Sequence, residues 1–167
     1  MLDFLFGSKK DRTSGNEAEA DPTKAGIRYD PELITELKSD HGELVAMFHE
    51  ISAITRKRDP RQLSQQLDEF GQVLQKHLLK ENVRFYIYLK SNLPESSQST
   101  IQRFAREMQQ IGRAVTDFLY KYTTVEQWDS SSWTTFEKEL ASIGTVLVQR
   151  IQSEENDLYT LYLPPSQ

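Results

Sequence analysis

The chain has 167 residues, of which 37% are hydrophobic, and this length and composition fit one domain with a buried core and a short tail. The formal net charge of −5, with basic residues scattered among acidic ones, argues against a surface for nucleic acid or for an anionic membrane. Because the chain has no cysteine, disulfides, thiolate zinc sites, iron–sulfur clusters and cysteine nucleophiles are excluded, which fits a cytoplasmic protein.

The first 27 residues have the composition of a flexible tail. Residues 7–27 are small, charged or turn-forming and offer almost nothing to bury. The apolar start, residues 2–6, is too short for a signal-peptide core, and no run in the sequence reaches membrane-spanning length. We expect this start either to dock on a partner or to lie loosely on its own domain. The folded domain is therefore predicted to comprise residues 28–167.

The first of four helical patterns begins at Asp30-Pro31, an N-cap followed by proline at the first helical position. Its apolar stripe, at spacings of three and four, is Leu33, Leu37, His41, Leu44, Phe48 and Ile51. His41 is therefore predicted to face the core, whereas His49 lies at the margin of the stripe.

The second helix begins with the same pattern at Asp59-Pro60 and is predicted to stop at Asn92-Leu93-Pro94. Its stripe is Leu63, Leu67, Phe70, Leu74, His77, Glu81, Phe85 and Tyr88. A His-x-x-x-Glu pair on a buried face is how one helix offers two ligands to a metal ion. A single histidine in such a stripe is more often an ordinary core residue.

The third stripe has no ionisable residue and consists of Ile101, Phe104, Met108, Ile111, Val115, Phe118 and Tyr122. A loop from Thr123 to Ser132, in which a serine is expected to act as the cap, leads to the fourth helix. The fourth stripe is Phe136, Leu140, Ile143, Leu147, Ile151, Glu154, Leu158 and Leu161. Four amphipathic segments, short connections and no strand pattern predict an all-α, antiparallel up-down four-helix bundle.

Two further groups of residues carry predictions about packing. Gly112 and Gly144, inside the third and fourth helices, are predicted to allow a close approach of neighbouring helices. Several aromatic residues either mark an exposed interface or close one end of the bundle. These are Tyr86, Trp128, Trp133, Tyr159 and Tyr162.

Inward-facing polar residues from three helices form a candidate metal site. His41, His77, Glu81 and either Glu154 or Glu155 supply two imidazoles and two carboxylates, which are ligands of iron, manganese and zinc. The third helix adds no ligand. Helical periodicity places Glu154 at the centre of its stripe.

Three stretches of the chain resemble hemerythrin-like (HHE cation-binding) domains, over residues 30–164. They are SDHGEL, LQKHLLKEN and RIQSEENDLYTLYLP. The resemblance implies a bundle that holds a non-haem di-iron centre, with ligands at the positions of His41, His77, Glu81 and Glu155.

The sequence departs from the family pattern where one iron would have its own ligands. The family's third-helix histidines fall near Met108 and Gly112, and its fourth-helix histidine falls at Arg150. A guanidinium there places a permanent positive charge near the vacated metal position, where it can pair with Glu81, Glu154 or Glu155. We therefore predict no di-iron centre. Two states remain open: a metal-free hydrogen-bonded cluster, which we favour, and a single iron, manganese or zinc ion.

A weaker resemblance, in LDEFGQVL and in the stretch that begins TFEKEL, is to the Rsd/AlgQ proteins, helical bundles that bind a sigma factor of RNA polymerase. It implies that such a bundle can be a binding module without a di-iron centre. No phosphate-binding glycine loop is present and no histidine lies near Ser130-Ser131-Ser132, so we expect no enzyme. The leading hypothesis is a regulatory or protein-binding module with a protein partner such as a sigma factor. Its rival is a mononuclear metal protein that senses or stores metal, oxygen or an oxidant.

Overall fold

The computed structural model describes residues 27–165, so almost all of the predicted tail, residues 1–27, lies outside the described part. The first helix is α1 (Leu33–Lys57). The second is a continuous run of α2 (Pro60–Lys80), a π-helical segment η2 (Glu81–Tyr86) and α3 (Ile87–Asn92). The third is α4 (Glu95–Thr123), and the fourth runs through α5 (Ser130–Ser153), a second π-helical segment η3 (Glu154–Leu158) and the 3-10 turn η4 (Tyr159–Leu161).

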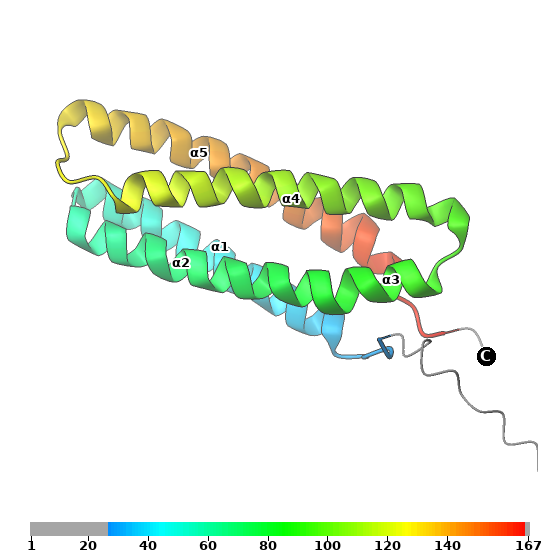
Figure 1. The fold of residues 1–167 in the computed structure, drawn as a ribbon. Helices are drawn as coiled ribbons and strands as arrows, with labels where there is room; N and C mark the ends of the chain where they lie inside the picture. Colours follow the sequence, from blue (N-terminus) through cyan, green and yellow to red (C-terminus); the bar gives the residue numbers. More distant parts are fainter. Residues whose placement is uncertain (1–26, 166–167) are drawn as a thin grey trace, which may run out of the picture.

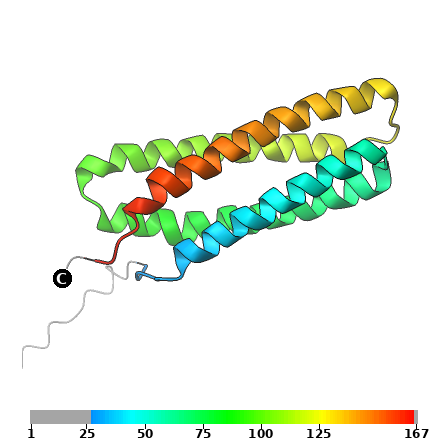
Figure 2. The same cartoon turned by 180° about the vertical axis from the view of Figure 1, so that it is seen from behind.

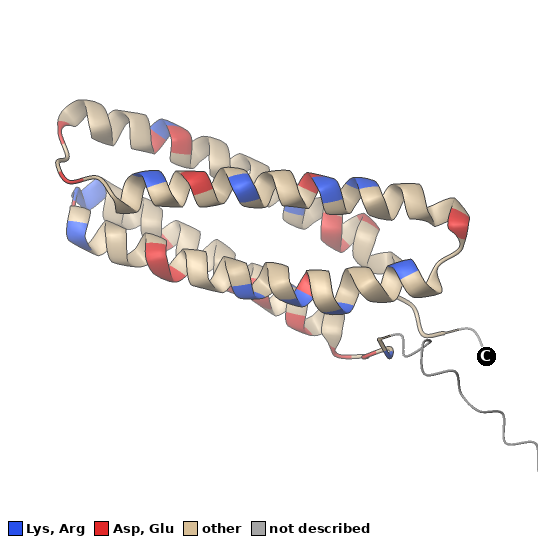
Figure 3. Cartoon of the chain, in the orientation of Figure 1, with Lys and Arg blue, Asp and Glu red and all other residues tan. Residues whose placement is uncertain are grey.

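These helices form the antiparallel four-helix bundle that the sequence predicts (Figure 1). α2 packs against α1 and α4, and α5 packs against α4 and α1; the view from behind shows α1 and α5 side by side (Figure 2). The described chain begins and ends at the same end of the bundle as α3 (Figure 1). Acidic and basic residues are interspersed along the long helices, and neither sign is confined to one part of the bundle (Figure 3). Among residues 27–165, no helix has both the length and the apolar character of a membrane span.

The N-cap is the predicted residue at α2, whereas at α1 and α5 it differs from the prediction. Asp59 caps α2 as predicted, since its side chain accepts a backbone N–H of the first turn at 3.0 Å. In α1 the N-cap is Glu32, and the side chain of Asp30 accepts the Glu32 N–H in a preceding turn, so the helix begins later than predicted. In α5 the cap is Asp129 and no serine, because its carboxylate accepts the Ser132 N–H at 2.7 Å.

Two apolar clusters fill the bundle, and a polar layer separates them. The cluster towards the α1–α2 turn holds the buried side chains of Leu44, Ile51, Ile54, Leu63, Leu67, Phe70, Leu74, Val115, Phe118, Tyr122, Trp133, Phe136 and Leu140. The cluster towards α3 holds those of Leu33, Leu37, Phe85, Tyr86, Tyr88, Leu89, Ile101, Phe104, Leu158, Tyr159 and Tyr162. Between them lie buried polar residues, which are His41, His77, Glu81, Arg150 and Glu154.

Gly144 allows α5 to approach α1 closely, as predicted, whereas Gly112 has a weaker role. A Cβ atom at Gly144 would lie 2.6 Å from Cζ of Phe48, which is too close, while one at Gly112 would meet Leu78 Cδ1 at 3.4 Å. Gly42, also within a helix, has nothing within 4 Å of such an atom. Of these three glycines, Gly144 is the one at which the packing requires glycine.

This contrast predicts opposite effects of one substitution. Gly42→Ala is expected to raise the free energy of unfolding by about 0.5–1 kcal/mol through helix propensity. Gly144→Ala gains the same propensity but forces the Phe48 ring to move, and overpacking of this kind costs about 1–3 kcal/mol. Urea denaturation of both variants checks the difference, and equal stabilisation would contradict the close approach at Gly144.

Candidate metal centre

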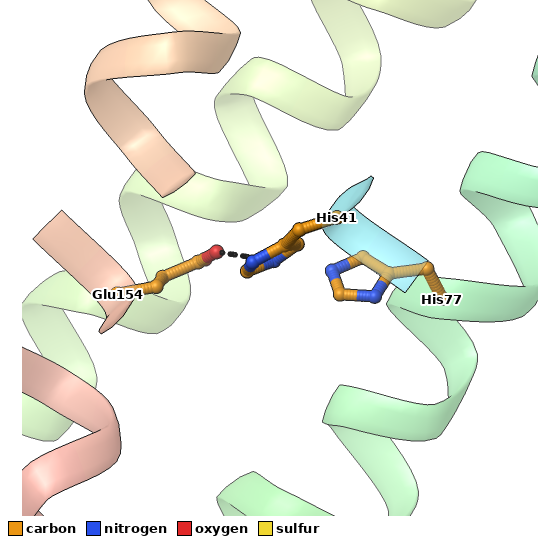
Figure 4. A group of neighbouring side chains, drawn as sticks. All are labelled: His41, His77 and Glu154. Atoms are coloured by element: carbon orange, nitrogen blue, oxygen red, sulfur yellow. Dashed lines mark ion pairs between the residues drawn. The ribbon is translucent and has the colours of Figure 1, made fainter. Parts of the chain in front are cut away.

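Three side chains in the polar layer bring nitrogen and oxygen ligand atoms together. One such atom from each of His41, His77 and Glu154 lies within 4.8 Å of the other two, and all three residues are buried (Figure 4). His41 comes from α1, His77 from the last turn of α2, and Glu154 is the first residue of η3. The imidazole centroids are 4.8 Å apart, and Nε2 of His41 is 3.3 Å from Glu154 Oε2. Two imidazoles and one carboxylate are a ligand set suited to zinc, iron or manganese.

Each histidine has a carboxylate on its Nδ1 atom. Nδ1 of His41 donates to Glu155 Oε1 at 2.8 Å, and Nδ1 of His77 donates to Asp40 Oδ2 at 3.3 Å. Because a carboxylate only accepts, these contacts put a proton on Nδ1 of each ring and leave Nε2 for the interior. Histidines that bind metal ions usually have such a carboxylate or carbonyl partner, which fixes the ring and raises its basicity.

Of the two candidate glutamates on the fourth helix, Glu154 lies in the polar layer and Glu155 lies outside it. Glu154, the alternative suggested by periodicity, is buried in the layer, while Glu155, the residue chosen from the family resemblance, has a side chain that is 29% exposed. Glu155 reaches His41 from the outside through Nδ1. The α-helix α5 runs up to Glu154, so the helical periodicity of the fourth stripe places this residue inward, as the structure shows. Glu155 is thus the partner of a candidate ligand and does not lie at the centre.

Glu81 begins the other π-helical segment and points into the same layer. Its Oε1 accepts the hydroxyl of Tyr159 at 2.7 Å, whereas its Oε2 is buried without a hydrogen-bond partner in the described part of the chain. Oε2 lies 3.9 Å from Nε2 of His77. A buried carboxylate oxygen with no partner is costly unless the group is protonated or binds a cation. The residues present therefore fit a metal ion at this place.

The charges in the layer depend on one another. Burial raises the pKa of Glu81 to about 8, and the neighbouring Glu154 adds to the shift. Burial alone would lower the pKa of His41, but its hydrogen bonds to Glu154 and Glu155 raise it above the ordinary value. Burial and the nearby His41 lower the pKa of His77. Burial acts to raise the pKa of Glu154, but His41 and Arg150 hold it below the usual range.

The raised pKa of Glu81 predicts a pH dependence of stability. The folded chain holds the proton on the Glu81 carboxyl more tightly than the unfolded chain does. In the unfolded chain the pKa of this carboxyl is near 4.5, so the stabilisation from the bound proton is complete below pH 4.5. It is lost as the pH rises to about 8. In chelator-treated protein we expect the free energy of unfolding to fall across this window, and Glu81→Gln, which stays neutral, to remove that part of the slope. Urea denaturation at several pH values measures it; an unchanged slope in the variant would contradict the assignment.

Arg150 occupies the side of the layer where the family pattern would place another histidine. Its Nε donates to Glu154 Oε1 and its Nη2 donates to the hydroxyl of Tyr86 at 2.9 Å. Its guanidinium carbon lies 5.1 Å from the centroid of the Phe104 ring. The predicted pairing with a carboxylate is therefore present: of the three predicted partners Arg150 pairs with Glu154, through Nε. Its Nη1 also lies 3.6 Å from Oε2 of the half-exposed Glu107. Within residues 27–165, His41, His77 and Glu154 form the one group of potential ligands, so no second set surrounds Arg150.

Two of the aromatic residues also belong to the polar layer, and one further residue of the layer is not predicted. Tyr86 and Tyr159 are buried in the cluster towards α3, which agrees with the prediction that aromatic residues close one end of the bundle. Their hydroxyls contact the layer, at Arg150 and at Glu81 respectively. Trp133 and Tyr162 are buried as well. The missed residue, Asp40, precedes His41 in the chain but contacts His77 on the next helix.

The sequence carries a signal for both tyrosines. Each is the fifth residue after an inward-facing glutamate, in ENVRFY and EENDLY. In an α-helix a spacing of five turns a side chain away from the first residue, but a π turn, whose hydrogen bonds span five residues, brings it back. The contacts cross between the helices: Tyr159 bonds to Glu81, and Tyr86 bonds to the arginine that pairs with Glu154.

An apolar cavity of about 70 Å³ reaches this layer between α1 and α5. His41, His77 and Glu154 border it on one side, and most of the other lining residues are apolar, among them Phe48 and Met108. Cavities for drug-sized ligands are about 300–1,000 Å³, so this one admits only a small molecule.

Comparison with known families gives a match over most of the chain. The family model described as "Hemerythrin HHE cation binding domain" matches residues 32–162, which include every residue of the polar layer. Comparisons with curated proteins and with solved structures find no match. The family match agrees with the first resemblance noted in the sequence and gives no support to the Rsd/AlgQ resemblance.

Proposed function

Because the chain belongs to the hemerythrin HHE cation-binding family, we propose that its polar layer binds a single transition-metal ion in place of a di-iron centre. His41, His77 and Glu154 would be the ligands, with Glu81 Oε2 beside them. The observation that carries the proposal is the pair of carboxylate-backed histidines next to a buried carboxylate oxygen without a partner. Iron, manganese and zinc suit these ligands, and such an ion would supply Lewis acidity or, for iron and manganese, redox chemistry.

A metal-free cluster explains fewer of these contacts. It accounts for Arg150, whose charge is balanced by Glu154. Protonation of Glu81 removes its charge but still leaves Oε2 without a hydrogen-bond partner among residues 27–165, and a metal-free cluster gives no reason for both imidazoles to be oriented by carboxylates. A single ion would lie beside Glu81 Oε2 and would bind the two oriented imidazoles. Arg150 would then occupy the place of the family's second iron.

The small apolar cavity supports a sensing role for this site. It offers a path for dioxygen or a comparably small oxidant and has no room for an organic substrate. We therefore propose a regulatory metal protein and not an enzyme, in which the layer responds to metal or oxidant.

Metal analysis tests the proposal. The full-length protein, produced with iron, manganese or zinc supplied in turn and then desalted, is expected to retain about one equivalent of one of these metals. Less than about a tenth of an equivalent of each would support the metal-free cluster, and about two equivalents would support a dinuclear centre.

The carboxylates on the two Nδ1 atoms give a further prediction. Asp40→Asn and Glu155→Gln are each expected to weaken metal binding by about 10–100-fold, because the rings lose the partners that orient them and raise their basicity. Competition with a chromophoric chelator measures the affinity. Asp68→Asn, an exposed acid on α2, is the matched control. Affinities equal to that of the control would show that these carboxylates have no such role.

A further inference from the structure

The outward face of the second helix carries a row of three apolar side chains. Leu79, Val83 and Ile87 are 61%, 43% and 42% exposed. They are spaced by four residues, a little more than one helical turn, over a length of about 12 Å. A single exposed leucine is ordinary, whereas three neighbouring apolar side chains offer a surface on which an apolar segment could pack.

The described chain begins next to this row. Asp30 forms an ion pair with Arg84, the residue that follows Val83. Residues 7–29 therefore connect the apolar start of the chain to a point beside the row. A chain of that length can span at most about 75 Å when fully extended, so it is long enough to reach every part of the row.

We propose that the N-terminal segment, residues 1–6, docks on the row formed by Leu79, Val83 and Ile87. The segment, MLDFLF, contains five apolar residues and one acid, Asp3. Its apolar side chains match the row in character. Lys76 and Lys90 lie three residues before and after the two ends of the row, so basic groups border it on the helix.

The tether favours this occupant over a second copy of the chain. Covalent linkage holds the segment at an effective concentration on the order of millimolar, which is far above the micromolar concentration of a second molecule in dilute solution. A weak apolar contact of a few side chains can be populated under those conditions, although it would not hold two separate molecules together.

Because the natural chain has no cysteine, an engineered pair can test the docking in the full-length protein. Ser8→Cys is combined with Asn82→Cys, which leaves both the segment and the row intact. The matched control combines Ser8→Cys with Thr160→Cys. Asn82 and Thr160 are both exposed, and each lies two residues from a partner of Asp30, namely Arg84 and Tyr162. Residues 9–29 can therefore bring the cysteine at position 8 from Asp30 to either position 82 or position 160.

Under mild oxidation the Asn82 pair is expected to form an intramolecular disulfide at least about tenfold faster than the Thr160 pair. Adding Phe4→Ser and Phe6→Ser should remove the difference. Equal rates in the two pairs, or a difference that survives the serine substitutions, would overturn the proposal. Disulfides between chains, seen as dimers on a non-reducing gel, would assign the row to a second copy and overturn it as well. The assay does not depend on bound metal.

Discussion

His77→Ala is expected to reduce the bound metal from about one equivalent per chain to less than about a tenth. The substitution removes one of the two imidazoles and also leaves Asp40 without the ring it orients. The two remaining ligands are His41 on α1 and Glu154 on η3. The second helix then contributes no ligand to the group, and only Glu81 of that helix lies beside it. Elemental analysis of the desalted protein provides the measurement.

His49 supplies the control for this loss. It lies on α1 two turns after His41, is exposed, and does not belong to the group of potential ligands. His49→Ala should therefore bind metal as the unmodified chain does. Circular dichroism establishes that both variants are folded. If His77→Ala is folded and retains a full equivalent, the metal site lies elsewhere and the proposed function is wrong.

Arg150→Met is expected to lower the free energy of unfolding by about 3–5 kcal/mol in chelator-treated protein, because it leaves a buried carboxylate without its cation. The side chains of Arg150 and Glu154 are 5% and 2% exposed, and the hydroxyl of Tyr86 would also lose its donor. Arg150→Met combined with Glu154→Gln should recover most of the loss, since no uncompensated charge then remains.

A second arginine–glutamate pair with the same spacing lies on the surface and serves for comparison. Arg103 and Glu107 are also four residues apart, but their side chains are 55% and 44% exposed. Glu107 also lies 3.6 Å from Arg150 Nη1, so Arg103→Met leaves Glu107 close to a cation. Arg103→Met is expected to change the free energy of unfolding by no more than about 1 kcal/mol. Urea denaturation of the variants compares the two pairs. A cost at Arg150 no larger than that at Arg103 would mean that the buried pair does not balance charge.

The fold could be predicted because spacings of three and four continue through all four helices. His41, His77 and Glu81 followed from the same pattern, since a polar residue in an otherwise apolar stripe must lie in the core. What periodicity could not reveal were the π turns at Glu81 and Glu154, each of which adds one residue without breaking the apolar pattern.

Those turns hid the role of the tyrosines five residues after the inward-facing glutamates. The choice between Glu154 and Glu155 stayed open for another reason: periodicity favours Glu154, whereas the family resemblance favours Glu155. Asp40 was missed for a different reason. Its partner, His77, lies on another helix, and no spacing within one helix reports a contact between two.

The protonation of the polar layer has a consequence for how an ion enters it. Burial raises the pKa of Glu81 to about 8, and the hydrogen bonds to Glu154 and Glu155 raise the pKa of His41, so both groups hold a proton more tightly than free side chains do. A proton on Nε2 of His41 would have to leave before that atom could bind an ion, and a proton on Glu81 would have to leave before its charge could balance the ion. Uptake of an ion would therefore release protons from the layer, and the affinity for the ion is expected to fall as the pH falls.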